Sequence, residues 1–142
     1  MANVGQVQGV TKLTGAENFT DEPIIFKEVE LSPHSISICV LGGDNTEIAL
    51  AIQNSRATGC DMGGNVTVLI DDFGREYTYR FYRPTEVPIK VRVEVRTDLT
   101  SPTNWETIVK NNVINFVDNS NIASLVTQPN LARHLHRNVS SF

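Results

Sequence analysis

The side chains that could perform chemistry are few in this 142-residue sequence, and they lie far apart along it. The histidines are His34, His134 and His136. His134 and His136 are two positions apart, so they face different directions on a helix, whereas on a strand they could share a metal ion. A third ligand does not lie near them in the sequence. We therefore predict no metal ligands, with a histidine site as the minor alternative.

The cysteines and the paired aspartates are equally poor candidates for catalysis. Cys39 and Cys60 match no metal-binding or redox spacing, which favours two unpaired thiols over a disulfide. Asp71 and Asp72 precede a glycine in a predicted turn, where aspartate commonly hydrogen-bonds the backbone. A general acid and a general base must converge in one pocket, and nothing in the sequence indicates such convergence. We therefore expect no catalytic residues, no cofactor and no enzymatic activity.

Gly42, Gly43 and Asp44 lie at a predicted junction between a strand and a helix, where a helix N-terminus could bind a phosphate group. The segment lacks the third glycine of a dinucleotide site and the Gly-Lys-Ser/Thr of a P-loop. Asp44 would repel an anion, but it suits the helix N-cap, with Glu47 three residues later. The sequence therefore favours a structural turn.

Residues 75–83 interleave aromatic side chains with arginines. Such a pattern on a sheet is typical of a face that binds single-stranded nucleic acid, with bases stacked on exposed rings and arginines on phosphates. One face of a strand here would carry Tyr77, Tyr79 and Phe81, which are more simply explained as core. The other face would carry Arg80 and Tyr82, with Arg83 following. A single-stranded nucleic-acid-binding module is therefore kept as the alternative function, and because the rings are more simply core, the sequence does not favour nucleic acid as a partner.

Composition and charge set the class of protein. Hydrophobic residues make up 40% and charged residues 20% of the chain, values typical of soluble domains, and no apolar run approaches the ~18 residues of a membrane helix. The first residues lack the basic start and apolar stretch of a signal peptide, so we expect synthesis in the cytoplasm and no membrane partner. The net charge of −4 is unevenly distributed: residues 75–96 carry six bases and three acids, and acids concentrate in residues 16–30. Such patches suit docking to copies or neighbours.

The element that would position the basic side chains is a long strand over residues 87–96. Its apolar residues alternate strictly with polar ones and are Val87, Ile89, Val91, Val93 and Val95. Ten residues would reach about 33 Å, so we expect two packing units to share this strand. The candidate interface residues are Lys90, Arg92 and Arg96 on its basic face, with Arg80 and Arg83 before it. The N-terminal arm is a second candidate surface.

The remaining pattern predicts an α+β fold with mixed and antiparallel sheets and with helices packed on the sheets. The first module, residues 1–84, would hold an N-terminal edge strand or arm, a strand over 35–41, a helix from Asp44 to Gly59 and a hairpin through 66–82. The second module, residues 85–142, would hold the long strand and a helix over 102–119, with Ser101 as N-cap and Pro102 at its first position. A last helix, capped by Thr127, would turn Leu131, Leu135 and Val139 inward.

Taken together, the glycines, caps and strand residues resemble a known family. The matching stretches are SPHS at 32–35, LGGDNTEIALAI at 41–52, TG at 58–59, GGN at 63–65, DFG at 72–74, and FYRPT at 81–85 leading into VPI at 87–89. They resemble the baseplate J-like family of contractile-tailed, Mu-like phages and prophages. The likeness covers about residues 5–139 and specifies a fold better than a catalytic site.

The resemblance implies a virion structural protein of the tail baseplate, assembled in the cytoplasm of the bacterial host. Such a protein is a wedge component around the hub, and its partners are other wedge and hub proteins, with further copies of itself as an option. Members of that family are longer, so the resemblance also implies that this chain corresponds to a C-terminal fragment of such a protein.

Overall fold

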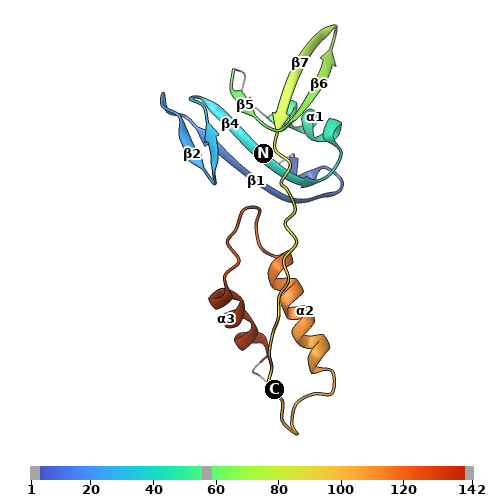
Figure 1. The fold of residues 1–142 in the computed structure, drawn as a ribbon. Helices are drawn as coiled ribbons and strands as arrows, with labels where there is room; N and C mark the ends of the chain where they lie inside the picture. Colours follow the sequence, from blue (N-terminus) through green and yellow to red (C-terminus); the bar gives the residue numbers. More distant parts are fainter. Residues whose placement is uncertain (1–3, 56–58, 140–142) are drawn as a thin grey trace. The chain divides into compact units, whose positions relative to one another are not determined.

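A computed structural model describes residues 4–55 and 59–139 and divides the chain into two units, residues 1–86 and 87–142. Three helices combine with mixed and antiparallel strands, so the prediction of an α+β fold is confirmed. The first unit contains η1 (Val4–Gln6), β1 (Val10–Asn18), β2 (Ile24–Phe26), β3 (Val29–Leu31), β4 (Ser35–Gly42), α1 (Asn45–Ser55), β5 (Asp61–Gly63), β6 (Val66–Asp72) and β7 (Arg75–Phe81) (Figure 1). The second unit contains α2 (Trp105–Asp118) and α3 (Gln128–Val139).

The main sheet of the first unit is built around β4. It has the order β1-β4-β5, with β1 antiparallel and β5 parallel to β4. The predicted strand over 35–41 therefore exists and lies in the interior of its sheet, as its apolar second half indicated. The predicted N-terminal edge strand also exists, but it begins at Val10, because the residues before it form a short 3-10 helix with Val4 buried in the core.

Helix α1 begins as the sequence predicts. The Asp44 carboxylate accepts hydrogen bonds from the backbone N–H groups of Thr46 (2.9 Å) and Glu47 (3.1 Å), which would otherwise lack partners in the first helical turn. The far end of the predicted helix falls at residues 56–58, which lie outside the described residues. Gly59 has a φ of +90°, as expected for a glycine that follows a helix.

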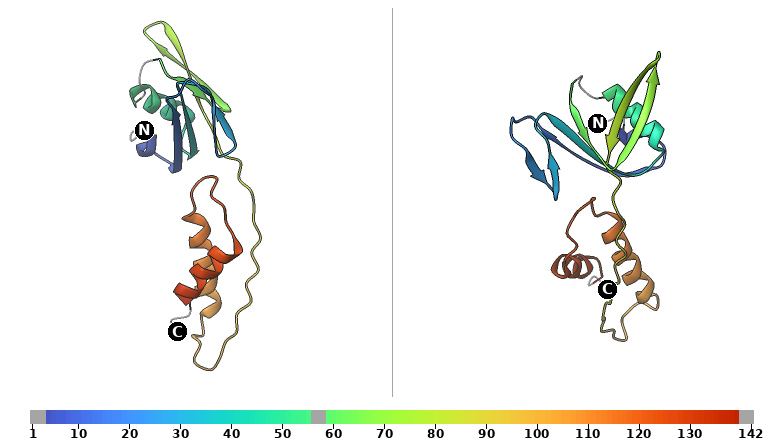
Figure 2. Two further views of the ribbon diagram at one scale, coloured as in Figure 1. Left: turned by 90° about the vertical axis from the view of Figure 1, so that its left-hand side faces the viewer. Right: turned by 45° about the horizontal axis from the view of Figure 1, so that its top comes forward.

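Two hairpins complete the first unit. The predicted hairpin joins β6 to β7 through Phe73 and Gly74, with φ values of 52° and 80°, the left-handed pair that a two-residue type I′ turn requires. The second hairpin, β2–β3, was not predicted; it turns through Lys27 and Glu28, also at positive φ. Figure 2 shows both hairpins extending from the body of this unit.

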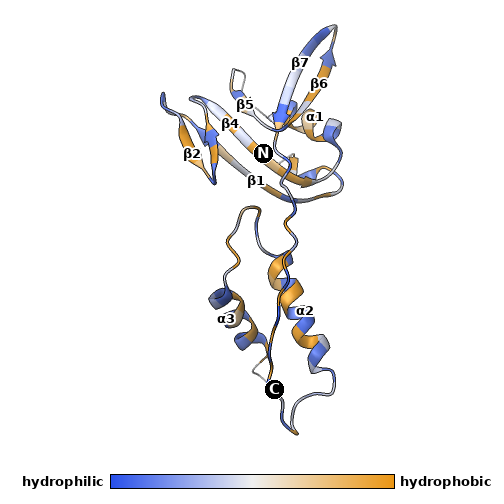
Figure 3. Ribbon diagram, viewed as in Figure 1, coloured by the Kyte–Doolittle hydropathy of each residue, from blue (hydrophilic) through white to orange (hydrophobic). Residues whose placement is uncertain are grey.

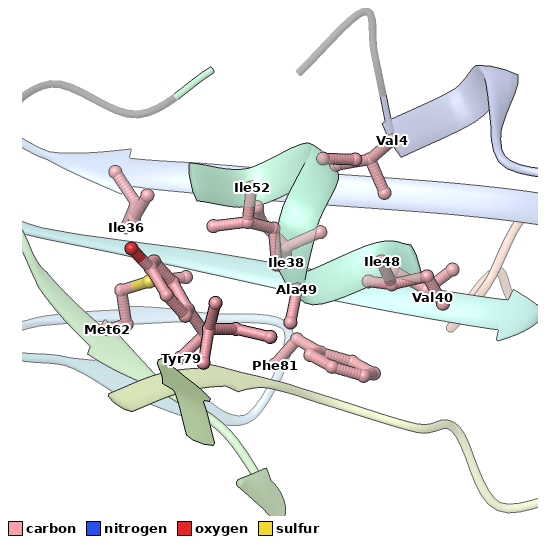
Figure 4. Close-up of a cluster of buried hydrophobic side chains, with 12 residues drawn as sticks. Val4, Ile36, Ile38, Val40, Ile48, Ala49, Ile52, Met62, Tyr79 and Phe81 are labelled. Carbon is pink, nitrogen blue, oxygen red and sulfur yellow. The ribbon is translucent and has the colours of Figure 1, made fainter. Parts of the chain in front are cut away.

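The hydrophobic core of the first unit lies between β4, α1 and the end of β7. Ile36, Ile38 and Val40 face Ile48, Ala49 and Ile52 of the helix, while Tyr79, Phe81 and Met62 close the cluster (Figure 4). Phe81 is fully buried. The next residue, Tyr82, forms a short parallel bridge with Cys39 of β4: the Tyr82 N–H donates to Ile38 O (2.7 Å), and the Val40 N–H donates to Tyr82 O (2.9 Å). The chain thus locks β7 against β4 just before this unit ends.

The second unit corrects two predictions. Residues 87–96 form no strand: Figure 1 shows an extended connection, and within the described ranges no backbone hydrogen bond joins 87–97 to another segment. A strand exists only when a neighbour completes its ladder, and the alternating pattern contains no information about that neighbour. Helix α2 begins at Trp105, three residues after Pro102, and its N-cap is Asn104; Ser101 instead closes a turn with Asp98. The predicted last helix follows Thr127, and the Leu131 N–H donates to Thr127 O (3.1 Å).

Candidate interaction surfaces

The segment 87–96, which we call the unpaired segment, keeps the two faces that its sequence gives it. On the apolar face, Val87 and Ile89 are 76% and 51% exposed, whereas Val91, Val93 and Val95 are each 37–38% exposed. Val93 and Val95 also line a hollow of about 440 Å³ together with Trp105, Val109 and Leu135 of the two helices. The apolar face is therefore only half covered within its own unit.

The polar face of the unpaired segment carries the predicted interface residues. Lys90, Arg92 and Arg96 are all exposed. Arg92 makes an ion pair with Glu94 (3.1 Å), and both side chains are more than 80% exposed, so the pair contributes little to stability. With three bases and one acid the segment carries a formal charge of +2. Its two unbonded backbone edges, its apolar row and its positive charge are the features that a strand-forming partner would recognise.

Arg83 has a structural role. Its guanidinium uses all five N–H donors within the first unit: it donates to the carbonyl oxygens of Val40 (3.1 Å), Gly42 and Gly43 (2.7 Å), and twice to Asn45 Oδ1. The group also lies over the Phe81 ring, with Cζ 5.2 Å from its centroid. Arg83 therefore fastens the end of β7 to the β4–α1 junction, and its guanidinium has no free donor for a partner.

The aromatic rings of β7 lie mostly in the core. Tyr79 and Phe81 are 3% and 0% exposed, so bases cannot stack on them, and their interpretation as core residues is confirmed. Tyr77, on the same face, is 36% exposed, so its interpretation as a core residue is wrong: it lies nearer the turn of the hairpin, away from the cluster around Phe81. Arg80 is exposed on the opposite face, and Tyr82 is half-buried, with its ring against Gly63. On β7 exposed aromatic surface is therefore limited to Tyr77, a single ring and not a row on which successive bases could stack.

The β2–β3 hairpin forms a second exposed surface, which in the sequence is visible only as a concentration of acidic residues. Residues 16–30 contain five acidic residues and Lys27, a formal charge of −4. All three residues of β2 are apolar (Figure 3), and Ile25 is 78% exposed. β3 pairs with β2 alone, and in the described ranges the outer edge of β2 has no strand beside it. We call this surface the acidic hairpin.

Asn18 holds the acidic hairpin to the sheet. This side chain is 1% exposed, and its Nδ2 donates to the carbonyl oxygens of Glu22 (2.8 Å), Leu31 (3.1 Å) and Ser32 (3.1 Å). Its Oδ1 accepts from the N–H and the hydroxyl of Thr20. Because both the Nδ2 and the Oδ1 atom of this buried amide have hydrogen-bond partners, Asn18 fixes the base of the hairpin at the end of β1.

The histidines, cysteines and aspartates do not assemble into a reactive centre. Among the described residues no group of three or more His, Cys, Asp or Glu side chains could hold a metal ion. His34 lies 2.7 Å from Asp21 on the surface, and His134 packs on Phe116, with ring centroids 5.1 Å apart. Asp71 accepts a hydrogen bond from the Gly74 N–H in the hairpin turn, as predicted.

Cys39 and Cys60 are both thiols and are not joined in a disulfide, as predicted. Partial burial on β4 raises the pKa of the Cys39 thiol, against a smaller lowering by Arg83. A thiol with a raised pKa holds little thiolate at neutral pH and is a poor nucleophile. Burial therefore makes Cys39 a packing residue.

Comparisons with known proteins add no family assignment. No family model matches the chain, and no curated protein matches it. In the described part of the chain, none of the helices has the length and apolar character needed to cross a bilayer.

Proposed function

We infer that this protein is a structural component of a phage tail baseplate: a wedge subunit that surrounds the hub and assembles with neighbouring baseplate proteins. The observation that carries the inference is the unpaired segment, which has the alternation of a sheet strand but no strand beside it within the described structure. The residue pattern that resembles the baseplate J-like family supplies the biological setting.

The unpaired segment is an incomplete structural element: its apolar face is partly uncovered and its backbone has no ladder within the described residues. A strand with an apolar face buries that face only when a sheet or a partner covers it, and its N–H and C=O groups gain protein partners only in a ladder. Here the apolar residues of the unpaired segment remain 37–76% exposed, and only Val93 and Val95 line the hollow beside the two helices. A chain with this feature is suited to complete its sheet with another protein, as strand-addition complexes do.

The first unit supports the same role in a different way. Its buried core, the hydrogen bonds of Asn18 and the five donated bonds of Arg83 hold together a packed unit that carries the acidic hairpin. A surface with a free strand edge and a concentration of charge is suited to binding other proteins. Catalysis instead requires reactive side chains that converge in one pocket. We therefore assign the protein no enzymatic activity and place it in the virion, assembled in the cytoplasm of the bacterial host.

The decisive test examines the genome and the particle that contain this protein. We expect genes for sheath, tube and spike proteins next to its gene, and we expect mass spectrometry to find it in purified contractile tails. Disruption of the gene should leave tubes and sheaths without complete baseplates in electron micrographs. Finding the protein outside a tail gene cluster, and absent from purified tails, would overturn the assignment.

A further inference from the structure

The unpaired segment and the acidic hairpin are complementary in charge, in backbone edges without a neighbouring strand and in exposed apolar side chains, and we propose that they bind each other between two copies of this chain. In this interface the unpaired segment of one copy forms a strand along the free edge of β2 in a second copy. The inference deepens the proposed structural role, on which it rests for its biological setting, by naming the partner.

Charge is the first reason for choosing the acidic hairpin as the partner surface. The unpaired segment carries +2, and the region around the hairpin carries −4. Lys90, Arg92 and Arg96 are exposed on the segment, and Glu22, Glu28 and Glu30 are exposed around the hairpin. Opposite potentials of this kind steer encounter and fix the register of two partners.

Backbone and apolar surface are the second reason. β2 has a strand on one side only, and the unpaired segment has none on either side within the described ranges. Next to these edges lie exposed apolar side chains: Ile25 is 78% exposed on the hairpin, and Val87 and Ile89 are 76% and 51% exposed on the segment. Pairing of the two would satisfy backbone groups and bury apolar rows in one step.

The same charges argue against a symmetric arrangement in which two unpaired segments bind each other. Both strands would carry +2, and like charges on neighbouring strands destabilise a sheet. The arrangement of segment on hairpin joins two different surfaces, so each copy keeps one surface of each kind for a further copy. Contacts of this type close into rings when the rotation allows and otherwise continue as chains.

Sedimentation equilibrium of the whole chain gives the first test. We expect association between about 10 µM and about 1 mM, because a three-residue edge gives a modest affinity. It should weaken when salt is raised from about 50 mM to about 500 mM, since these charges are exposed and screened. A chain that stays monomeric to about 1 mM at the lower salt contradicts the proposal.

Charge reversal tests which surfaces meet. Lys90→Glu, Arg92→Glu and Arg96→Glu together should weaken self-association at least about tenfold, and so should Glu22→Lys, Glu28→Lys and Glu30→Lys together. A mixture of the two triple variants should associate, since the unaltered segment of one variant meets the unaltered hairpin of the other, and the two reversed surfaces also complement each other. The matched control for the segment variant is Lys110→Glu, Arg133→Glu and Arg137→Glu, which lowers the net charge by the same amount at exposed helical positions and should keep association. Undiminished self-association of the hairpin variant overturns the proposal in favour of symmetric pairing.

Hydrogen exchange tests the strand itself. In the mixture of triple variants, amides of residues 89–96 and of β2 should slow relative to either variant alone, because a ladder protects them. Association without this protection would exclude strand pairing. If the chain remains monomeric but occurs in purified tails, only the self-association fails; if it associates but its gene lies outside any tail cluster, only the baseplate assignment fails.

Discussion

The two units of this chain differ in how much of their apolar surface they bury themselves. Among the described residues, thirteen buried hydrophobic side chains belong to the first unit and two, Val109 and Leu131, belong to the second. In the first unit, β4 brings residues from η1, α1, β5 and both strands of the β6–β7 hairpin into one cluster. In the second, two helices and the unpaired segment surround a hollow of about 440 Å³. One unit completes its own core, and the other leaves apolar surface for a partner.

The difference has a simple physical origin. A sheet collects side chains from distant parts of a sequence, whereas two helices and one extended segment supply few apolar faces. The apolar stripe of α2 does face inward, since its residues are less exposed than their neighbours, but only Val109 is fully covered. We therefore expect the first unit to be stable alone and the second to gain stability from assembly.

The largest expected difference between the units is in hydrogen exchange of the whole chain at a concentration where it is monomeric. Amides in the interior of β4 should exchange more than about 10³-fold more slowly than in an unstructured peptide, because they open only with the first unit. Amides of residues 89–96 should exchange within about tenfold of the unstructured rate, because they have no acceptor in the described structure. Mass spectrometry of peptides from both segments measures this in one experiment. If amides of β4 and of residues 89–96 were equally protected in the monomer, the proposed difference between the two units would be wrong.

Two phenylalanines of the β6–β7 hairpin test the core of the first unit. Phe81 is fully buried, so Phe81→Ala should lower the free energy of unfolding by about 3–5 kcal/mol through lost burial and a cavity. Phe73 lies at the hairpin turn and is fully exposed, so Phe73→Ala should change it by less than about 0.5 kcal/mol. Urea denaturation followed by circular dichroism gives both values. Equal effects would mean that the cluster around Phe81 does not dominate the stability of this unit.

The Arg83 clamp should contribute less than the core but more than a surface charge. Arg83→Met leaves three carbonyl oxygens and Asn45 without their donor, so we expect a loss of about 2–3 kcal/mol. Arg83→Lys should recover only part of it, because an ammonium lacks the planar fork. The control is Arg80→Met, which removes an exposed arginine from the same strand and should leave the free energy of unfolding nearly unchanged. If Arg83→Met left the free energy of unfolding unchanged, the structural role of Arg83 would be wrong and the residue would again be a candidate for the interface.

The sequence predicted the elements whose signals are local. Asp44 with Glu47 marked the start of α1, and Phe73-Gly74 between two apolar runs marked the β6–β7 hairpin. The β2–β3 hairpin was not predicted because its turn residues are Lys27 and Glu28, and neither is a glycine or an asparagine, the residue types that indicate positive φ. The start of α2 was misplaced because Ser101 and Pro102 suit a helix start as well as the turn that they form.

The interaction surfaces could be predicted only in part, because they depend on which segments lie next to each other in the fold. The alternation of residues 87–96 fixes which side chains share a face, but a ladder depends on a neighbouring strand that the pattern does not encode. Arg83 looked like an exposed base because its acceptors, at Val40 to Asn45, lie about forty positions earlier in the chain. Charge clustering did point to the acidic hairpin, yet the edge of β2 became visible only with the fold.

The smallest predicted effect concerns the turn before α2, where the second unit is ordered by local hydrogen bonds. The Asp98 carboxylate accepts from the hydroxyl and the N–H of Thr100 (2.6 and 2.9 Å) and from the Ser101 hydroxyl (3.3 Å), and these bonds hold the pKa of Asp98 below its usual range. A lowered folded pKa means that the turn gains stability above the unfolded pKa and loses it as pH falls through the folded value. An NMR titration should show the Asp98 carboxyl and the Thr100 amide shifting together at that lower pH. Asp98→Ala should abolish the shared transition and broaden the Thr100 signal, whereas Asp98→Asn, which keeps an acceptor oxygen, should remove the titration but leave the turn. Retention of the Thr100 signal in the alanine variant would show that the backbone alone holds this turn.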